Sequence, residues 1–202
     1  MSRISRKERL TRAAIGYRVP NLGAEKWRAG TPAVTLRGEV EDGLPKGKPS
    51  MSTGTIAFIY IASTAAGPVR SVNEVHAVPG AGLEGDRYAL GQGTFSKPLP
   101  DRELTLIEAE AIEAMKRDYD VELAPGEARR NLVTRGIALN HLVGRDFQIG
   151  DVKFHGIRLC EPCDHLQRLT ERAVIKGLRH RGGLRAQILT QGTIRVGDHL
   201  RS

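Results

Sequence analysis

The sequence has few of the residues that crosslink a fold, and no segment that could cross a membrane as a helix. Of its 202 residues two are cysteine, one is tryptophan, and 4% are aromatic. The two cysteines lie three positions apart and could close only a small ring, so disulfides do not hold this fold together. No run of about 18 apolar residues exists, and no apolar signal-peptide core is present. We therefore expect a cytoplasmic protein, in a compartment where thiols stay reduced.

Three common ligand-binding motifs are also missing. No G-x-G-x-x-G follows a predicted strand, and the sequence contains neither a P-loop nor an H-E-x-x-H pair. The glycine-rich segment 79–87 lacks the helix that a dinucleotide fingerprint requires. The sequence therefore gives no sign of a mononucleotide, dinucleotide or zincin-type site.

The excess of positive charge lies mainly at one end of the chain. The whole sequence has 31 Lys and Arg against 23 Asp and Glu, a net charge of +8 and a pI near 9.9, which ordinarily suggests nucleic acid as a partner. Residues 1–50 hold 11 of the basic and 5 of the acidic residues, so residues 51–202 hold 20 and 18, a net charge of only +2. Nucleic acid is therefore not expected as a partner of the folded region.

Residues 1–50 are expected to form a basic, disordered extension, and residues 51–202 a folded domain. The extension lacks apolar periodicity and ends in the linker-like segment 41–50, which is rich in glycine, proline and charge. Three origins stay open for it: translation that naturally begins at Met51, a basic arm for targeting or partner binding, and an organelle transit peptide, which acidic residues interrupt.

A chain that begins at Met51 is expected to melt at the same temperature as the full chain, because the apolar core should begin near Thr55. Thermal unfolding followed by circular dichroism measures this. A fall of several degrees, which corresponds to about 1–2 kcal/mol for a domain of this size, would instead show that the extension packs on the core.

The folded region is predicted to be mainly β (α+β), a strand-rich, barrel-like fold with two or three short helices. Alternation of apolar and polar residues, or short apolar runs between turns, predicts strands; the segments are 55–62, 72–78, 139–149, 152–159, 184–189 and 193–200. The turns Gly150-Asp151 and Gly197-Asp198 each separate two short strands, which is more typical of a barrel edge than of a βαβ layer.

Two helices are predicted from capping signals. The first covers about 106–119, with Thr105 as its cap and Glu108 completing a T-x-x-E capping box before an apolar stripe. The second covers about 171–180, with Thr170 as its cap and two glycines at its end. Both are expected to contribute apolar faces to the core.

The two cysteines, Cys160 and Cys163, are the strongest chemical signal in the sequence. Residues 152–159 before them alternate as a half-buried strand does, and residues 164–169 after them resemble a short helix capped by Asp164. Cys163 would then lie just outside a helix N-terminus, where the partial positive charge favours thiolate over thiol. A thiolate is a strong nucleophile and a soft ligand for molybdenum, copper or zinc.

Four other interpretations of the cysteine pair fit the sequence less well. A structural zinc site needs further ligands, and none of the nearby histidines has finger-like spacing. Covalent haem attachment requires a histidine directly after the second cysteine, where Asp164 stands. A thioredoxin-like redox pair would follow the first strand of a βαβ unit, whereas this pair comes late in the sequence, after a strand-rich stretch. Two buried, inert cysteines would not suit a loop that contains Pro162.

Three polar clusters accompany the cysteines, at 85–88, 129–134 and 180–185. Each places arginine beside glycine, asparagine or threonine. Guanidinium groups and such hydrogen-bond donors bind anionic ligands, although any single arginine would more often form a solvated surface pair. Three such clusters together with a reactive cysteine favour a binding site.

Five motifs occur in order along the folded region. They are Gly82-Leu83-Glu84-Gly85-Asp86-Arg87, the segment from Arg102 to Glu108, Arg130-Asn131-Leu132, the segment from Leu142 to Gly150, and Cys160-Glu161-Pro162-Cys163. In this order and spacing they resemble the MOSC domain, the molybdenum cofactor sulfurase C-terminal domain, over about residues 56–200. Neither the pyridoxal-phosphate domain of the family's sulfurases nor the N-terminal barrel of its amidoxime-reducing members is recognisable, so the resemblance is to a stand-alone member.

The resemblance implies a barrel-like fold that binds the pterin-based molybdenum cofactor, with one cysteine that coordinates the metal or carries sulfur. Cys163 matches the family cysteine better than Cys160, and is expected to be both the metal ligand and the catalytic residue. Residues of the polar clusters would bind the cofactor: Gly85, Asp86, Arg87, Arg130, Asn131, Thr134 and Arg185. Loss of the guanidinium at Arg130 or Arg185 is expected to weaken cofactor affinity about tenfold.

Three functions follow from the resemblance and stay open. The first is a molybdenum-dependent oxidoreductase that reduces a small N-hydroxylated or related substrate and is served by a separate electron donor. The second is a sulfur carrier, in which a Cys163 persulfide, received from a separate sulfurase protein, is delivered to a metal-sulfur centre. The third is a non-enzymatic cofactor-binding module.

Overall fold

The computed structural model of the protein describes residues 53–95, 97, 99–170 and 172–202. The extension predicted for residues 1–50 lies outside the described residues, and so does Met51. The MOSC-like region is described almost completely, and the following features concern that part of the chain.

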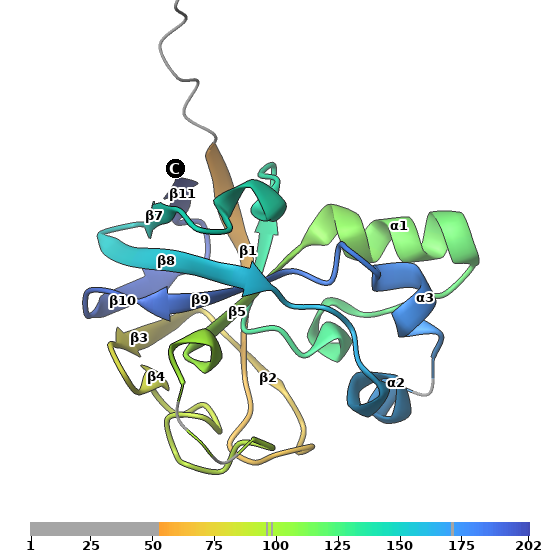
Figure 1. Ribbon diagram of the computed structural model, residues 1–202, viewed down its shortest axis with the longest axis horizontal. Coiled ribbons are helices and arrows are strands. Elements are labelled where there is room, and N and C mark those ends of the chain that lie inside the picture. The colour runs from red at the N-terminus through yellow and green to blue at the C-terminus, as the bar shows by residue number, and fades with distance from the viewer. Residues whose placement is uncertain (1–52, 96, 98, 171) are drawn as a thin grey trace, which may run out of the picture. The chain divides into compact units, whose positions relative to one another are not determined.

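Seven strands form a closed ring of hydrogen-bonded neighbours (Figure 1). In order around the ring they are β1 (Thr53–Ile61), β11 (His199–Arg201), β7 (Asp146–Ile149), β8 (Val152–Leu159), β9 (Leu184–Ile188), β5 (Leu104–Glu108) and β6 (Leu132–Arg135), which returns to β1. Neighbouring strands are antiparallel, except that β5 and β6 run parallel. β1 also pairs with the short strand β2 (Arg70–Val72). Closure satisfies both edges of the ring strands, as in other β-barrels.

A smaller sheet of three strands packs its apolar residues into the same core. Its order is β10 (Gly192–Arg195), β3 (Glu74–Val78) and β4 (Gly82–Leu83). Val75, Leu83 and Ile194 join the buried barrel residues in one apolar cluster. The rings of Phe147 and Phe154 stack within this cluster, with their centroids 5.4 Å apart. The main core therefore lies inside the barrel and under the small sheet.

The helices gather on one side of the barrel, to the right in Figure 1. They are α1 (Ala109–Tyr119), α2 (Asp164–Thr170) and α3 (Val174–Leu178), and short 3₁₀ turns occur at Pro100–Arg102, Pro125–Ala128 and Leu139–Leu142. Their apolar faces form a second buried cluster against β5 and β6, which includes Met115, Leu166 and Leu178. None of the described helices is long and apolar enough to cross a membrane. The predicted fold class, mainly β and barrel-like with two or three short helices, is confirmed.

The first predicted helix begins three residues later than the sequence suggested. Residues 104–108 form β5, and α1 begins only at Ala109. Thr105 does not cap a helix, because its hydroxyl donates a hydrogen bond to the side chain of Asn131 on the neighbouring chain segment, at 2.8 Å. Glu108 accepts a hydrogen bond from the Leu139 amide at 2.7 Å. A strand that is buried between β9 and β6 shows no alternation of apolar and polar residues, so its apolar run was mistaken for a helix turn.

Other predicted boundaries were wrong for related reasons. The second helix was expected over 171–180, whereas α3 covers only Val174–Leu178, and Thr170 ends α2. The segment 139–149 is a 3₁₀ turn followed by β7, not one strand. The turn at Gly150 joins β7 and β8 as a hairpin, as expected. Gly197, at φ +92°, instead carries the chain from the small sheet to the barrel, because β10 and β11 belong to different sheets.

Candidate functional site

The cysteine pair lies where β8 ends and α2 begins, as the sequence predicted. Cys160 directly follows β8 and is buried, with 2% of its surface exposed, whereas Cys163 is exposed. The Gln167 amide donates to the Cys163 carbonyl at 3.0 Å, which is the first hydrogen bond of the helix. Asp164 is therefore the first residue of α2, and the cap position falls on Cys163 itself. The two thiols differ in access, and only Cys163 is presented to solvent.

Arg130 holds the cysteine loop to the rest of the fold. Its guanidinium donates to the Cys160 carbonyl through Nη2 and to the Gly182 carbonyl through Nε, both at 2.9 Å, and to the Ala128 carbonyl through Nη1 at 3.1 Å. The side chain is buried, with 8% of the residue exposed. Three directed bonds from one buried cation join the cysteine corner, at Cys160, to the neighbouring segments at Ala128 and Gly182. Arg130 is thus a framework residue of the loop as well as a residue that lines the site.

Two glycines let the chain before β9 pass close under the cysteine loop. The Cys160 amide donates to the Gly183 carbonyl at 2.7 Å. A Cβ at Gly182 would lie 2.5 Å from the Cys160 carbonyl oxygen and 2.9 Å from Pro162. Gly183 has φ +107°, a conformation that residues with a side chain rarely adopt. The two glycines, predicted to end a helix, do not do so, because α3 ends at Leu178; they are required instead for the close contact with the cysteine corner.

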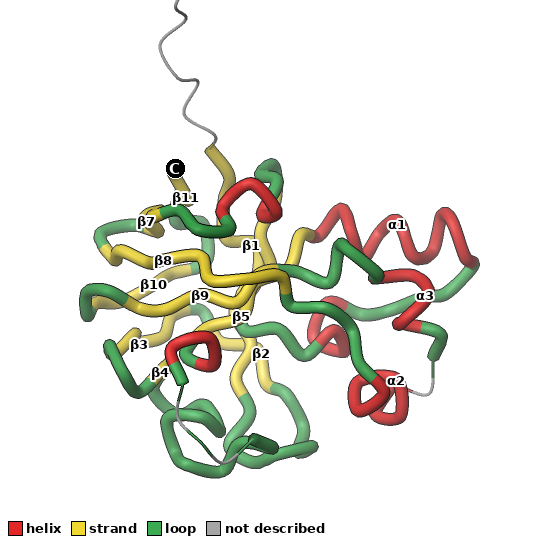
Figure 2. The backbone as a smooth tube through the Cα atoms, viewed as in Figure 1, coloured by secondary structure: helices red, strands yellow, loops and turns green. Residues whose placement is uncertain are grey.

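A small cavity opens beside the cysteine corner, with a volume of about 70 Å³. Four arginines line it together with both cysteines, a histidine, and polar and apolar side chains: Arg87, Tyr88, Thr94, Phe95, Thr105, Arg129, Arg130, Cys160, Cys163, His165, Leu166, Leu169 and Arg185. These residues come from the loop after β4, the start of β5, the segment before β6, the cysteine corner, α2 and β9. Figure 2 shows how long the loop between β4 and β5 is, and this loop supplies four of the lining residues. None of the described lining residues is acidic.

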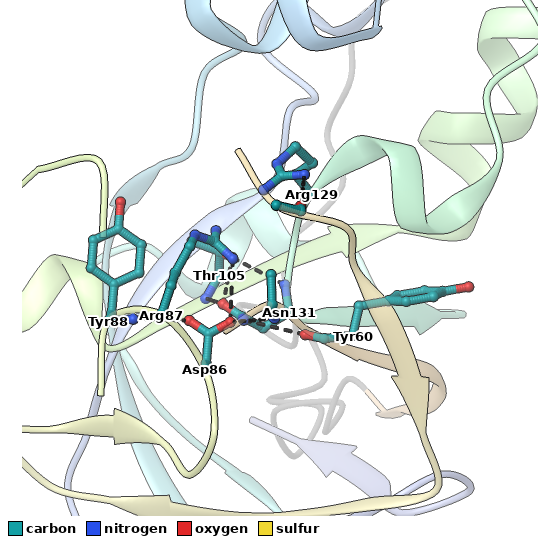
Figure 3. Close-up of polar contacts among 9 residues, drawn as sticks. Tyr60, Asp86, Arg87, Tyr88, Thr105, Arg129 and Asn131 are labelled. Carbon is teal, nitrogen blue, oxygen red and sulfur yellow. Dashed lines mark hydrogen bonds and ion pairs between the residues drawn. The ribbon is translucent and has the colours of Figure 1, made fainter. Parts of the chain in front are cut away.

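Two of the arginines that line this cavity, Arg87 and Arg129, lie close enough for their positive charges to repel each other. Burial lowers the pKa of Arg129, and the positive charge of Arg87 lowers it further, while Asp86 acts in the opposite direction. Arg129 adopts φ +54° and donates to the Gly67 carbonyl through Nη1 at 2.8 Å. Arg87 pairs with Asp86 at 3.2 Å and lies over the ring of Tyr88 (Figure 3). Because the two cations disfavour each other, an anion in the cavity would relieve their repulsion.

Arg185 brings a third cation to the cavity from β9. Its Nη1 donates to the backbone carbonyl of Asp101 at 3.0 Å, and its buried Nε has no partner among the described residues. The Asp101 carboxylate accepts from Arg158 Nε through Oδ2 at 2.8 Å, and its Oδ1, like Arg185 Nε, is buried without a hydrogen-bond partner among the described residues. Arg185 bonds the backbone carbonyl of Asp101 and forms no ion pair with a described carboxylate.

Asp86 organises the loop that carries Arg87. Its Oδ1 accepts from the Ala62 amide at 3.1 Å and from Arg87, and its Oδ2 accepts from the Tyr88 amide at 3.3 Å (Figure 3). The residue is 2% exposed and does not line the cavity. Gly85 precedes it at φ +76° and also lies outside the cavity lining. Both residues shape the turn that positions Arg87.

Asn131 and Thr134 are buried and serve contacts between strands. Asn131 accepts from the amide and hydroxyl of Thr105 through Oδ1, and its Nδ2 donates to the Tyr60 carbonyl at 3.3 Å (Figure 3). Thr134 donates to the Ile107 carbonyl at 3.3 Å. Asn131 thus connects β1, β5 and the start of β6, and Thr134 connects β6 to β5. Neither side chain reaches the cavity lining.

The structure thus brings Cys163, Arg87, Arg130 and Arg185 together at one cavity, whereas Gly85, Asp86, Asn131 and Thr134 lie outside its lining. The sequence analysis included Arg129 in the polar cluster 129–134 but did not name it among the cofactor-binding residues. Adjacent residues outside a regular element point in directions that the sequence does not reveal, and the left-handed backbone at Arg129 turns its side chain to the cavity as well. His165 was missed too, since a single histidine gives no spacing signal.

Comparison with known proteins adds independent findings. A model of the MOSC domain matches residues 74–201. No curated protein matches the sequence. The solved structure of the YUAD protein of Bacillus subtilis is similar with a TM-score of 0.63 at 15% identity, over 75% of this chain and 96% of that chain. YiiM of Geobacillus stearothermophilus is similar with a TM-score of 0.57 at 14% identity, over 73% of each chain. YiiM of Escherichia coli is similar with a TM-score of 0.53 at 19% identity, over 74% of this chain and 67% of that chain. At such identities the similarity shows the shared fold.

Proposed function

This chain belongs to the MOSC domain family, and on that basis we propose that the cavity beside Cys163 binds a molybdenum cofactor, with Cys163 as the protein ligand of the metal. The observation that carries the proposal is the lining: an exposed thiol shares one cavity with four arginines and, among the described lining residues, no carboxylate. A thiolate suits a soft metal, and guanidinium groups suit phosphate and other anions.

The residues present fit such a group by their chemistry. The buried Nε of Arg185 has no described partner and is available to an acceptor. The cavity of about 70 Å³ admits only part of a pterin cofactor, but a second pocket of about 290 Å³ shares the lining residues Tyr88 and Phe95 with it. The two spaces together offer room for a ligand larger than the cavity alone.

Within this proposal each residue has a separate task. Cys163 offers its sulfur to the metal, while Arg87, Arg129 and Arg185 bind the anionic end of the cofactor. Arg130 keeps the cysteine loop in place through its bonds to the Cys160 and Gly182 carbonyls. When bound, the cofactor supplies a redox-active metal, and with it the capacity to reduce a small N-hydroxylated or related substrate with electrons from a separate donor.

The direct test is the composition of the protein purified from cells that make the molybdenum cofactor. Molybdenum is measured by elemental mass spectrometry, and the pterin by the fluorescence of its oxidised form. We expect both in equal amounts, near one per chain. A protein from such cells that contains neither would contradict the proposal.

Replacing Arg129 or Arg185 with glutamine should weaken cofactor binding about tenfold for each, because a hydrogen bond to a charged group contributes roughly 1.5–3 kcal/mol. Retained pterin after dialysis measures the effect. The matched control is Arg195→Gln, which removes the same charge from an exposed side chain that pairs with Glu74 on the small sheet. Wild-type retention in both cavity variants would mean that these arginines do not bind the cofactor.

A sulfur carrier is the second candidate function, and the exposure of Cys163 favours it. A partner sulfurase could reach this thiol directly, whereas the nearby Cys160 is buried. In this function Cys163 would hold a persulfide for delivery to a metal-sulfur centre, and no substrate would be reduced. Molybdenum-free protein that carries a persulfide on Cys163 would distinguish it from the first.

A further inference from the structure

The size of the cavity beside Cys163 suits a small ligand. Its volume is about 70 Å³, and a water molecule occupies about 30 Å³ in the liquid. The cavity therefore has room for a few water molecules or for one small oxyanion.

The charge of the lining selects an anion. Arg87, Arg129, Arg130 and Arg185 face this space, and the only carboxylate in contact with any of these four side chains among the described residues is Asp86, at Arg87. Each of the three guanidinium nitrogens of Arg130 donates a hydrogen bond to a backbone carbonyl, which fixes the side chain in place. Because these acceptors are neutral, the positive charge of Arg130 is not neutralised. Three guanidinium charges without a carboxylate partner favour a multiply charged anion in this space.

A nucleophilic thiol, Cys163, lies at the edge of this cavity. Cys163 lines the cavity and is exposed at the same time, so its sulfur is accessible both to a ligand held by the arginines and to a molecule arriving from solvent. An oxyanion that the arginines bind, and that carries a sulfur atom open to nucleophilic attack, would place that atom beside a thiolate.

We propose that the cavity binds a small sulfane-sulfur oxyanion of the thiosulfate class, and that Cys163 accepts its outer sulfur. The Cys163 thiolate attacks the outer sulfur, a new S–S bond forms, and the bond from the outer sulfur to the sulfonate sulfur breaks. Sulfite leaves with the electron pair of that bond, and its three oxygens remain paired with the arginines. The products are a Cys163 persulfide and sulfite, and the total charge is unchanged. This inference rests on the sulfur-carrier function and names the donor from which the chain takes sulfur.

The test uses the full-length protein and thiosulfate itself, with cyanide as a sulfur acceptor for turnover. We expect intact-mass spectrometry to show the gain of one sulfur atom per chain, mapped to Cys163, together with an equal amount of released sulfite. With cyanide present, thiocyanate should form steadily. Cys163→Ser should give neither product. Arg129→Gln and Arg185→Gln should raise the KM for thiosulfate about tenfold, and Arg195→Gln should leave it unchanged.

Several results would overturn the proposal. A wild-type protein that releases no sulfite from thiosulfate contradicts it, and so does sulfur that is found on Cys160 or that still appears in Cys163→Ser. Equal KM values in all arginine variants would mean that the cavity does not hold the oxyanion. Because molybdenum and pterin are measured separately, failure here leaves the proposed cofactor binding untouched. A persulfide that forms only from a partner sulfurase would keep the carrier function and remove thiosulfate as its donor.

Discussion

Cys163→Ser is expected to abolish both cofactor retention and persulfide formation, with a loss of at least about tenfold in bound molybdenum. A serine hydroxyl stays protonated at neutral pH and is a hard ligand, so it replaces neither the nucleophile nor the soft metal ligand. Because Cys163 is exposed, the change should leave folding stability nearly unaltered. Bound molybdenum, pterin fluorescence and intact mass together measure the loss, and thermal unfolding checks that the fold is intact.

The matched control is Cys160→Ser, which changes the other thiol in the same corner. Cys160 is buried and is held by its backbone, through the Gly183 carbonyl and Arg130, so its side chain is not required for ligand access. We expect most of the cofactor or persulfide to remain, with a stability cost of about 1–3 kcal/mol for a buried hydroxyl. Equal loss of function in both variants would show a mechanism that uses both thiols and would refute the separate roles assigned here.

Arg130→Ala should have the largest effect on stability among the arginine variants, lowering the free energy of unfolding by about 3 kcal/mol or more. Its three hydrogen bonds end on the carbonyls of Ala128, Cys160 and Gly182, and truncation leaves these groups without their charged donor in a buried place. For a domain of this size the melting temperature should fall by roughly 6–12 °C. The loosened loop should also make Cys160 react faster with a thiol reagent such as dithionitrobenzoate.

Arg135→Ala provides the comparison for Arg130. It removes an arginine from the nearby strand β6, where the exposed side chain pairs with Glu113 and Glu110. Exposed pairs contribute little, so we expect a change within about 0.5 kcal/mol and unaltered thiol reactivity. If Arg130→Ala were as stable as Arg135→Ala and lost only ligand affinity, the arginine would serve the ligand rather than the loop.

The interpretation of Arg130 changed most between sequence and structure. The sequence placed it in a polar cluster and predicted that it contacts the cofactor, so that its loss would weaken cofactor affinity about tenfold. The structure adds that it bonds across 52 positions to Gly182 and across 30 to Cys160. Such partners are set by how β6 and β9 enter the barrel, and local composition does not encode them. Arg129, by contrast, belonged to the same polar cluster, but only its position at the cavity singled it out as a ligand-binding candidate.

The misplaced start of α1 has a similar origin. A Thr-x-x-Glu pattern stabilises a helix start only when no stronger partner competes for the same groups. Here Thr105 bonds Asn131 and Glu108 bonds the Leu139 amide, so both side chains serve contacts with residues 26 and 31 positions away. Tertiary contacts thus overrode a valid local signal.

The sequence by itself determined the strand-to-helix corner that presents Cys163, the predominance of strands, and the family to which the chain belongs. Each of these depends on short-range spacing: alternation along 152–159, two cysteines three positions apart, and motifs in a fixed order. Only the tertiary structure decided that β5 and β6 pair in parallel, that the barrel closes between β1 and β11, and that four arginines meet at one cavity. Those features depend on contacts between distant segments, whose geometry follows from packing the whole chain around its core and not from any local pattern of residues.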